Sequence, residues 1–176
     1  MTSKPSTLEK VWTTEAGFKA AVILTRGKFR CGYVGVESTH PLFEIHYDTN
    51  TNYLIEVSED DQVGDRGIIT VICGKERMQS PAMVFDVHGS LTFSDKWGPN
   101  SIFEDLKDGL WYFGFDCIHA GDGELPDLDE NGEIIHTQWM NTDPVRSLEY
   151  VVEHCESLAK QIKDKTLPLK TITFEA

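Results

Sequence analysis

Several side chains that can do chemistry follow an aromatic run in the second half of the chain. The segment from Trp111 to Ile118 has the alternation of a buried strand, and the Ala-Gly pair beyond it ends that pattern. Asp116, Cys117, His119 and Asp122 therefore lie at or just past a strand end, where binding and catalytic sites are commonly built. Alternation groups the Cys117 thiol with the aromatic rings, which favours a packed structural cysteine over a nucleophile.

The carboxylates and imidazoles near this strand end suit either a metal site or a network of structural hydrogen bonds. Asp86 and His88 are two residues apart on an expected strand, so they point to the same side. Together with Asp116, His119 and Asp122 they could bind Zn²⁺, Mn²⁺ or Fe²⁺, provided that a turn or bulge lets Asp116 and His119 converge. We favour the alternative, in which the histidines hydrogen-bond loop backbone and Asp116 anchors a turn. No metal or cofactor is therefore expected.

Basic residues gather in one predicted hairpin. Lys28 and Arg30 share a strand face beside the Arg26-Gly27 turn. A small phosphate could bind this cluster, or the charges could protect a solvated hairpin edge. Trp111 and Tyr112 on the aromatic strand could offer stacking surfaces to a ligand.

The order of the expected elements predicts the fold class. Strand patterns come first and one long amphipathic helix comes last, which is typical of an α+β domain whose mainly antiparallel sheet is covered by one helix. The helix is expected from Pro144 to about Lys163, capped by Asp143. Residues 1–176 are expected to form one domain, in which 1–12 could be a disordered tail. The expected strands are 18–25, 28–36, 53–57, 68–73, 82–88, 90–94 and 111–118.

Charge and composition exclude some classes of partner. The formal net charge is −13, and the stretch from Asp108 to Val145 holds nine acidic residues and no lysine or arginine, so nucleic acid is not an expected partner. The chain has four scattered cysteines, no apolar signal core in residues 1–12 and no apolar run long enough to span a bilayer. We expect reduced thiols, a cytoplasmic location and no membrane partner.

Motifs spread over most of the chain resemble those of a known family. The string from Trp111 to Asp122, W-Y-F-G-F-D-C-I-H-A-G-D, is similar to a motif of small proteins encoded by bacteriophages and prophages. The family more often has glycine at the positions of Ser90 and Glu44. Its members carry no assigned activity, and the resemblance implies a protein of the host cytoplasm that sequesters host molecules or blocks host proteins. The other similar blocks are 30–36, 40–43, 87–92, 147–151 and 153–159.

Three functions remain open at this point. The leading hypothesis is a non-catalytic, anti-defence protein that encloses a small polar or nucleotide-like ligand, such as a host immune signal, between the aromatic strand and the basic hairpin. The alternatives are a metal-dependent hydrolase that uses the same aspartates and histidines, and an acidic inhibitor of a host protein. The oligomeric state is left open. The residues expected to bind the ligand are Lys28, Arg30, His88, Trp111, Tyr112, Asp116, His119 and Asp122.

Overall fold

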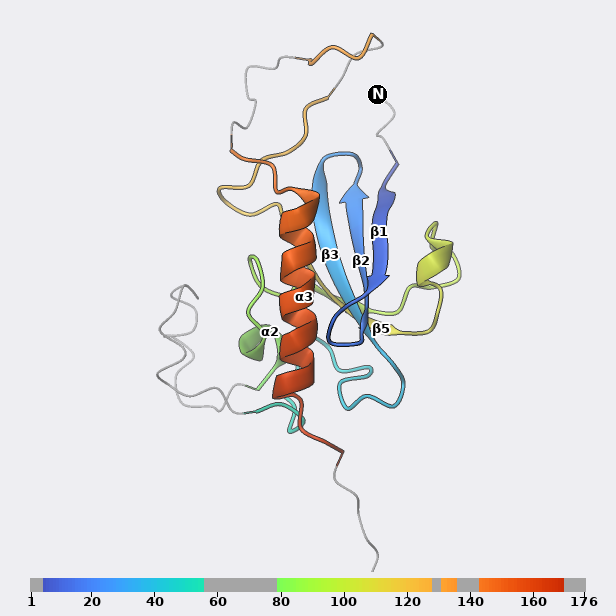
Figure 1. Cartoon of the computed structure of the whole chain (residues 1–176), viewed down its shortest axis with the longest axis vertical. Helices are drawn as coiled ribbons and strands as arrows, with labels where there is room; N and C mark the ends of the chain where they lie inside the picture. The colour runs from blue at the N-terminus through green and yellow to red at the C-terminus, as the bar shows by residue number, and fades with distance from the viewer. Residues whose placement is uncertain (1–4, 56–78, 128–130, 136–142, 170–176) are drawn as a thin grey trace, which may run out of the picture.

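Five strands of the described residues pair into one antiparallel sheet, in the order β1-β2-β3-β5-β4, of which Figure 1 shows β1, β2 and β3 side by side. The computed structural model describes residues 5–55, 79–127, 131–135 and 143–169. The strands are β1 (Thr7–Thr13), β2 (Lys19–Thr25), β3 (Phe29–Val36), β4 (Phe93–Asp95) and β5 (Trp111–Asp116). Because β4 pairs with β5 only between Tyr112 and Gly114, the Asp116 end of β5 lies beyond the ladder with β4. Of the predicted site residues, Asp116, His119 and Asp122 lie at or just past this end.

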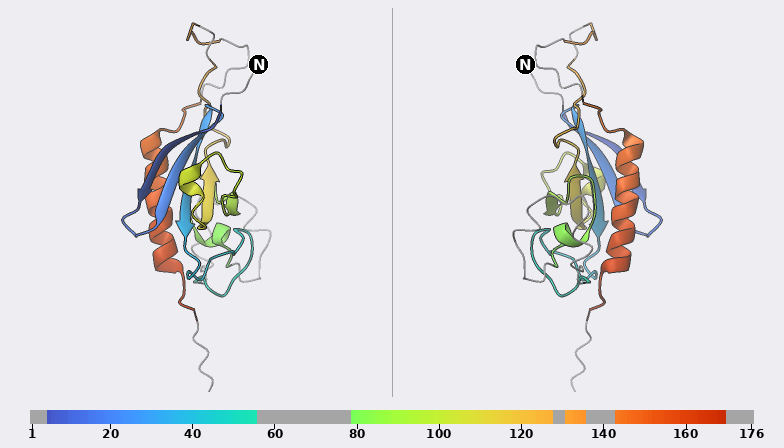
Figure 2. Two further views of the ribbon diagram at one scale, coloured as in Figure 1. Left: turned by 90° about the vertical axis from the view of Figure 1, so that its right-hand side faces the viewer. Right: turned by 90° about the vertical axis from the view of Figure 1, so that its left-hand side faces the viewer.

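One long helix, α3 (Leu148–Lys165), covers one face of the sheet (Figure 2). The chain therefore forms the predicted α+β domain, an antiparallel sheet packed by one C-terminal helix. The helix begins at Leu148 instead of Pro144, because Ser147 and not Asp143 caps it: the Ser147 hydroxyl accepts a hydrogen bond from the Tyr150 N–H at 3.1 Å. The buried stripe of α3, which packs against β2, β3 and β5, consists of Val151, Cys155, Leu158, Ala159 and Ile162.

The turn between β2 and β3 has the conformation that the sequence predicts. Arg26 and Gly27 both have positive φ, at 49° and 66°, and the Lys28 N–H donates to the Thr25 carbonyl at 2.9 Å. Two central residues with positive φ define the type I′ turn, whose twist matches that of the paired strands. The hairpin prediction is confirmed.

Aromatic rings lie across glycines of the neighbouring strand between β3 and β5. The three opposed pairs are Gly32 with Phe115, Gly114 with Tyr33 and Gly35 with Tyr112. A Cβ on Gly32 would stand 2.5 Å from the Phe115 ring and 2.7 Å from the Cys155 sulfur of α3. The missing side chain of Gly32 thus lets both the ring and the helix approach the sheet closely.

A second, smaller core lies on the sheet face away from α3. The 3-10 turn η2 (Glu104–Leu106) and its neighbours pack there, and Leu106 is fully buried. The buried members of this core are Ala21, Ile23, Cys31, Tyr33, Leu106 and Tyr112. Side chains of β3 and β5 therefore alternate between two cores.

The start of the chain differs from the prediction. Residues 7–13 form β1, paired with β2, whereas the sequence suggested that 1–12 could be a disordered tail. The register shifts between Leu8 and Lys10, which makes Glu9 the extra residue of a bulge. A bulge breaks the period-two pattern, and this is why the strand is hard to recognise from sequence.

The strand predicted over 82–88 is also wrong. Residues Pro81–Val84 form the short helix α2, with the proline in its first turn, and the chain then runs on without strand pairing. Phe85 and Val87 are buried while Asp86 is exposed, so the alternation in this segment is real. It reflects burial against the core and not membership of a sheet.

The remaining strand predictions have mixed outcomes. The strand expected at 90–94 begins later, as β4. In the described part of 53–57, only Leu54 forms a bridge, with Thr166. The strand expected at 68–73 lies outside the described residues. None of the helices in the described ranges has the length and apolar content that crossing a membrane requires.

Candidate functional site

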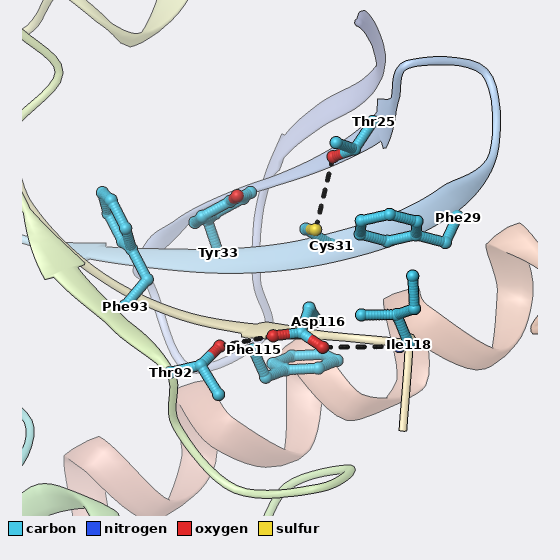
Figure 3. A pocket seen from close by; sticks show the side chains of 9 residues that line it. All are labelled: Thr25, Phe29, Cys31, Tyr33, Thr92, Phe93, Phe115, Asp116 and Ile118. Carbon is cyan, nitrogen blue, oxygen red and sulfur yellow. Dashed lines mark hydrogen bonds between the residues drawn. The ribbon is translucent and has the colours of Figure 1, made fainter. Parts of the chain in front are cut away.

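A cavity of about 300 Å³ opens on the sheet face away from α3, beside the end of the β2–β3 hairpin (Figure 3). We call it the Asp116 cavity. Its walls come from the end of β2, from β3, from β5 and the chain just after it, and from the chain just before and within β4, and they are mostly aromatic and aliphatic. The lining residues are Thr25, Phe29, Cys31, Tyr33, Thr92, Phe93, Phe115, Asp116 and Ile118.

Asp116 places one carboxylate in the wall of this cavity. Its Oδ2 accepts a hydrogen bond from the Thr92 hydroxyl at 2.8 Å, and its Oδ1 accepts one from the Ile118 N–H at 3.3 Å (Figure 3). These two bonds fix the orientation of the carboxylate. Because a carboxylate has about four acceptor positions, Asp116 can still accept hydrogen bonds from a ligand.

The other polar groups in the cavity wall carry no charge at neutral pH. Burial raises the pKa of both the Cys31 thiol and the Tyr33 hydroxyl. The Thr25 hydroxyl lies 3.4 Å from the Cys31 sulfur and is hydrogen-bonded to it. Asp116 is the one acidic or basic residue among those that line the cavity.

A polar cluster lies just past the end of β5, next to the first turn of α3. At its centre is Asp122, whose side chain is 1% exposed. Its Oδ2 accepts hydrogen bonds from His88 Nε2 at 2.7 Å and from the His119 N–H at 2.9 Å, and its Oδ1 accepts one from Arg146 Nε at 2.6 Å. The Tyr150 hydroxyl lies 3.0 Å from His88 Nδ1 and is hydrogen-bonded to it. We call these five residues the Asp122 cluster.

The charge of Asp122 is strongly stabilised. Burial alone would raise the pKa of this carboxyl, but hydrogen bonds from His88, Arg146 and the His119 N–H outweigh that effect and lower the pKa to about 2. The cluster therefore holds a permanent buried carboxylate at neutral pH.

His119 connects the cluster to the Asp116 cavity. Its Nε2 lies 3.7 Å from Asp116 Oδ1, and its Nδ1 lies 3.6 Å from Asp122 Oδ2. The imidazole rests against the backbone of Gly89, which has φ +68° and where any Cβ would collide with the ring. The structure thus brings Asp116, His119 and Asp122 together, along with His88.

Other residues that the sequence suggested as ligand contacts lie elsewhere. Arg30 points to the α3 side and forms a two-point ion pair with Glu9, with its Nε 2.7 Å from Oε2. Lys28 lies 2.7 Å from the Asp127 carboxylate. Neither basic side chain lines the Asp116 cavity, although Thr25, Phe29 and Cys31 of the same hairpin do.

The two aromatic residues suggested for stacking are also engaged within the protein. Tyr112 is fully buried, and its hydroxyl donates to Asp108 Oδ2 at 2.8 Å. The Trp111 indole N–H donates to the Ile45 carbonyl at 3.0 Å. Asp86 is exposed and lies outside the group of residues whose ligand atoms could share a metal, which are His88, His119 and Asp122.

Cys117 has the structural role that alternation predicts. It is 1% exposed within the core under α3, and burial, with a smaller effect of the Asp122 charge, raises the pKa of its thiol to about 12. Such a thiol is protonated at neutral pH and is a poor nucleophile.

Sequence reasoning missed Arg146, Tyr150 and Thr92. Arg146 is the first basic residue after the long acidic stretch, and this isolated position was a usable signal. Tyr150 and Thr92 had no comparable signal, because their contacts depend on how α3 and the 85–92 segment pack. Comparison of the chain with models of protein families, with curated proteins and with solved structures found no match.

Proposed function

We propose that the chain is a non-catalytic binding protein that holds a small, flat ligand with N–H donors in the Asp116 cavity. The observation that carries the proposal is the combination of aromatic walls, from Phe29, Tyr33 and Phe93, with a single oriented carboxylate. Aromatic rings favour stacking with a flat ligand, and a carboxylate only accepts hydrogen bonds. A nucleobase with adjacent N–H groups meets both requirements.

The volume of the cavity and the charge of its lining restrict the class of ligand further. A volume of about 300 Å³ lies at the lower end of the ~300–1,000 Å³ range of small-molecule sites, so it suits a base or nucleoside and not a dinucleotide. No lining residue is basic, and Asp116 would repel a phosphate. The ligand class that fits is thus the base portion of a nucleotide-like molecule.

Sequestration fits the cavity better than catalysis does. The Cys31 thiol is kept protonated by burial, and neither a lysine nor an arginine lines the cavity to stabilise developing negative charge. The resemblance to phage-encoded proteins adds that the bound molecule would be one of the host cell. In this proposal the protein lowers the free concentration of that molecule without changing it.

Release of the ligand by heat is the first test. Protein purified from the producing cells is denatured, and the supernatant is analysed by mass spectrometry. We expect an intact base-containing small molecule in an amount comparable with the protein. A chemically altered product would support the hydrolase alternative, and capture of a host protein without any small molecule would support the inhibitor alternative.

Variants test the site itself. Replacing Asp116 by Asn should weaken binding of nucleobases and nucleosides, measured by calorimetry, by roughly tenfold or more, because a hydrogen bond to a charged group contributes ~1.5–3 kcal/mol. Asp95→Asn is the matched control, because Asp95 is exposed on β4 and its replacement changes the net charge by the same amount. Equal affinities of the two variants would show that the ligand does not contact Asp116.

A further inference from the structure

We infer that the Asp122 cluster is a divalent metal site, in which His88 Nε2, His119 Nδ1 and Asp122 Oδ2 bind one Zn²⁺ or a similar ion. The site adjoins the Asp116 cavity through the contact of His119 with Asp116, but none of its three donor residues lines that cavity. One possible ligand atom from each of these three residues lies within 4.8 Å of those of the other two. Two imidazoles and one carboxylate are a donor set that Zn²⁺ and Fe²⁺ commonly accept.

The distances between the donor atoms are close to those of a metal site. Bonds of ~2.0–2.2 Å at tetrahedral angles separate neighbouring ligand atoms by roughly 3.3–3.5 Å. Asp122 Oδ2 lies 2.7 Å from His88 Nε2 and 3.6 Å from His119 Nδ1, values on either side of that separation. The remaining separation, between the two imidazoles, is within 4.8 Å, so binding an ion would require these side chains to move closer together.

Two of the three donor residues also have a hydrogen-bond partner for their other polar atom. His88 Nδ1 is hydrogen-bonded to the Tyr150 hydroxyl, and Asp122 Oδ1 to Arg146. His119 Nε2 faces Asp116 Oδ1 at 3.7 Å. Ligands of protein-bound metals are usually held in this way by a second layer of contacts. Since the Tyr150 hydroxyl can accept as well as donate, His88 can present the lone pair of Nε2 to an ion.

His119 provides the observation that points to a missing ligand. Its Nδ1 is buried and has no hydrogen-bond partner among the described residues. Leaving a buried nitrogen without a hydrogen bond is energetically costly, so a protein rarely retains one without use. Gly89 leaves the space in which this ring stands, because a Cβ there would collide with it. A metal ion between His119, His88 and Asp122 would satisfy the nitrogen.

Direct metal titration tests the inference. Full-length protein is treated with EDTA, dialysed, and titrated with Zn²⁺ by calorimetry, while Co²⁺ is used to record the visible spectrum of a tetrahedral site. We expect one Zn²⁺ per chain, a raised melting temperature and a tetrahedral Co²⁺ spectrum. Absence of stoichiometric Zn²⁺ binding would overturn the inference.

Three variants locate the ion. His119→Ala should abolish the tetrahedral Co²⁺ spectrum, and Tyr150→Phe should lower Zn²⁺ affinity by roughly 10–100-fold, as expected for the loss of a partner of a ligand. His46→Ala is the matched control, because His46 is half-exposed beside Asp48 and away from the cluster. If His119→Ala does not fold, judged by circular dichroism, Tyr150→Phe still decides. Wild-type affinity in Tyr150→Phe, or in a folded His119→Ala, would refute the site.

Discussion

Adding one methyl group at Gly32 should loosen the contact between α3 and the sheet. Gly32 lies opposite Phe115 in the β3–β5 ladder, and a Cβ there would stand 2.5 Å from the Phe115 ring and 2.7 Å from the Cys155 sulfur. Carbon atoms in good contact are ~3.5–4.0 Å apart, so the overlap with the ring is about 1.0–1.5 Å. Phe115 is 1% exposed and Cys155 is fully buried, so neither has open space to move into.

The size of the effect follows from two opposing terms. Overpacking of a close-packed core costs ~1–3 kcal/mol, while replacing glycine by alanine stabilises by ~0.4–1 kcal/mol through the unfolded chain. We therefore expect Gly32→Ala to lower the free energy of unfolding by about 1–2 kcal/mol in urea titration. Gly98→Ala is the matched control, because a Cβ on Gly98 meets nothing within 4 Å, and it should be neutral or slightly stabilising.

A double-mutant cycle with Phe115→Leu shows whether the clash is the cause. Leucine lacks the ring edge that the new methyl group would meet, so Gly32→Ala should cost less in the Phe115→Leu background. The expected coupling is ~0.5–3 kcal/mol, the usual range for residues in contact. Equal costs of Gly32→Ala in both backgrounds, or equal stabilities of the Gly32→Ala and Gly98→Ala proteins, would refute the close-packing argument.

Three further predictions concern stability. Ser90→Gly should raise the free energy of unfolding by about 0.5–1 kcal/mol, because Ser90 has φ +100°, which glycine adopts without strain; a loss of stability would contradict this. Leu158→Ala should lower it by roughly 2–5 kcal/mol, since Leu158 is fully buried under the sheet, and a loss below about 0.5 kcal/mol would mean that this position is not core. Burial tends to raise the pKa of Asp108, but hydrogen bonds from Lys19, the Leu110 N–H and Tyr112 lower it below the ordinary value. The contribution of ionised Asp108 to the free energy of unfolding should therefore be present above pH ~4 and be lost as pH falls through the lowered pKa. Wild type and Asp108→Asn should then converge in stability in acid. A difference in stability that does not change with pH would exclude this linkage.

The sequence alone determined the parts of this protein that depend on local patterns. Apolar residues three and four apart predicted the helix α3, and the Arg26-Gly27 pair predicted the hairpin turn. Alternation also placed Cys117 in the core. Such features are visible in sequence because a few neighbouring residues decide each of them.

The tertiary structure decided which polar groups meet. His88 pairs with Asp122 across thirty-four positions of the chain, because the 85–92 segment runs beside the free end of β5. Arg30, which looked available for a phosphate, pairs with Glu9 only because β1 joins the sheet through a bulge. Local propensity carries no information about such pairings. They depend on packing between distant segments, which settles both the partner of each charge and the place where a cavity stays open.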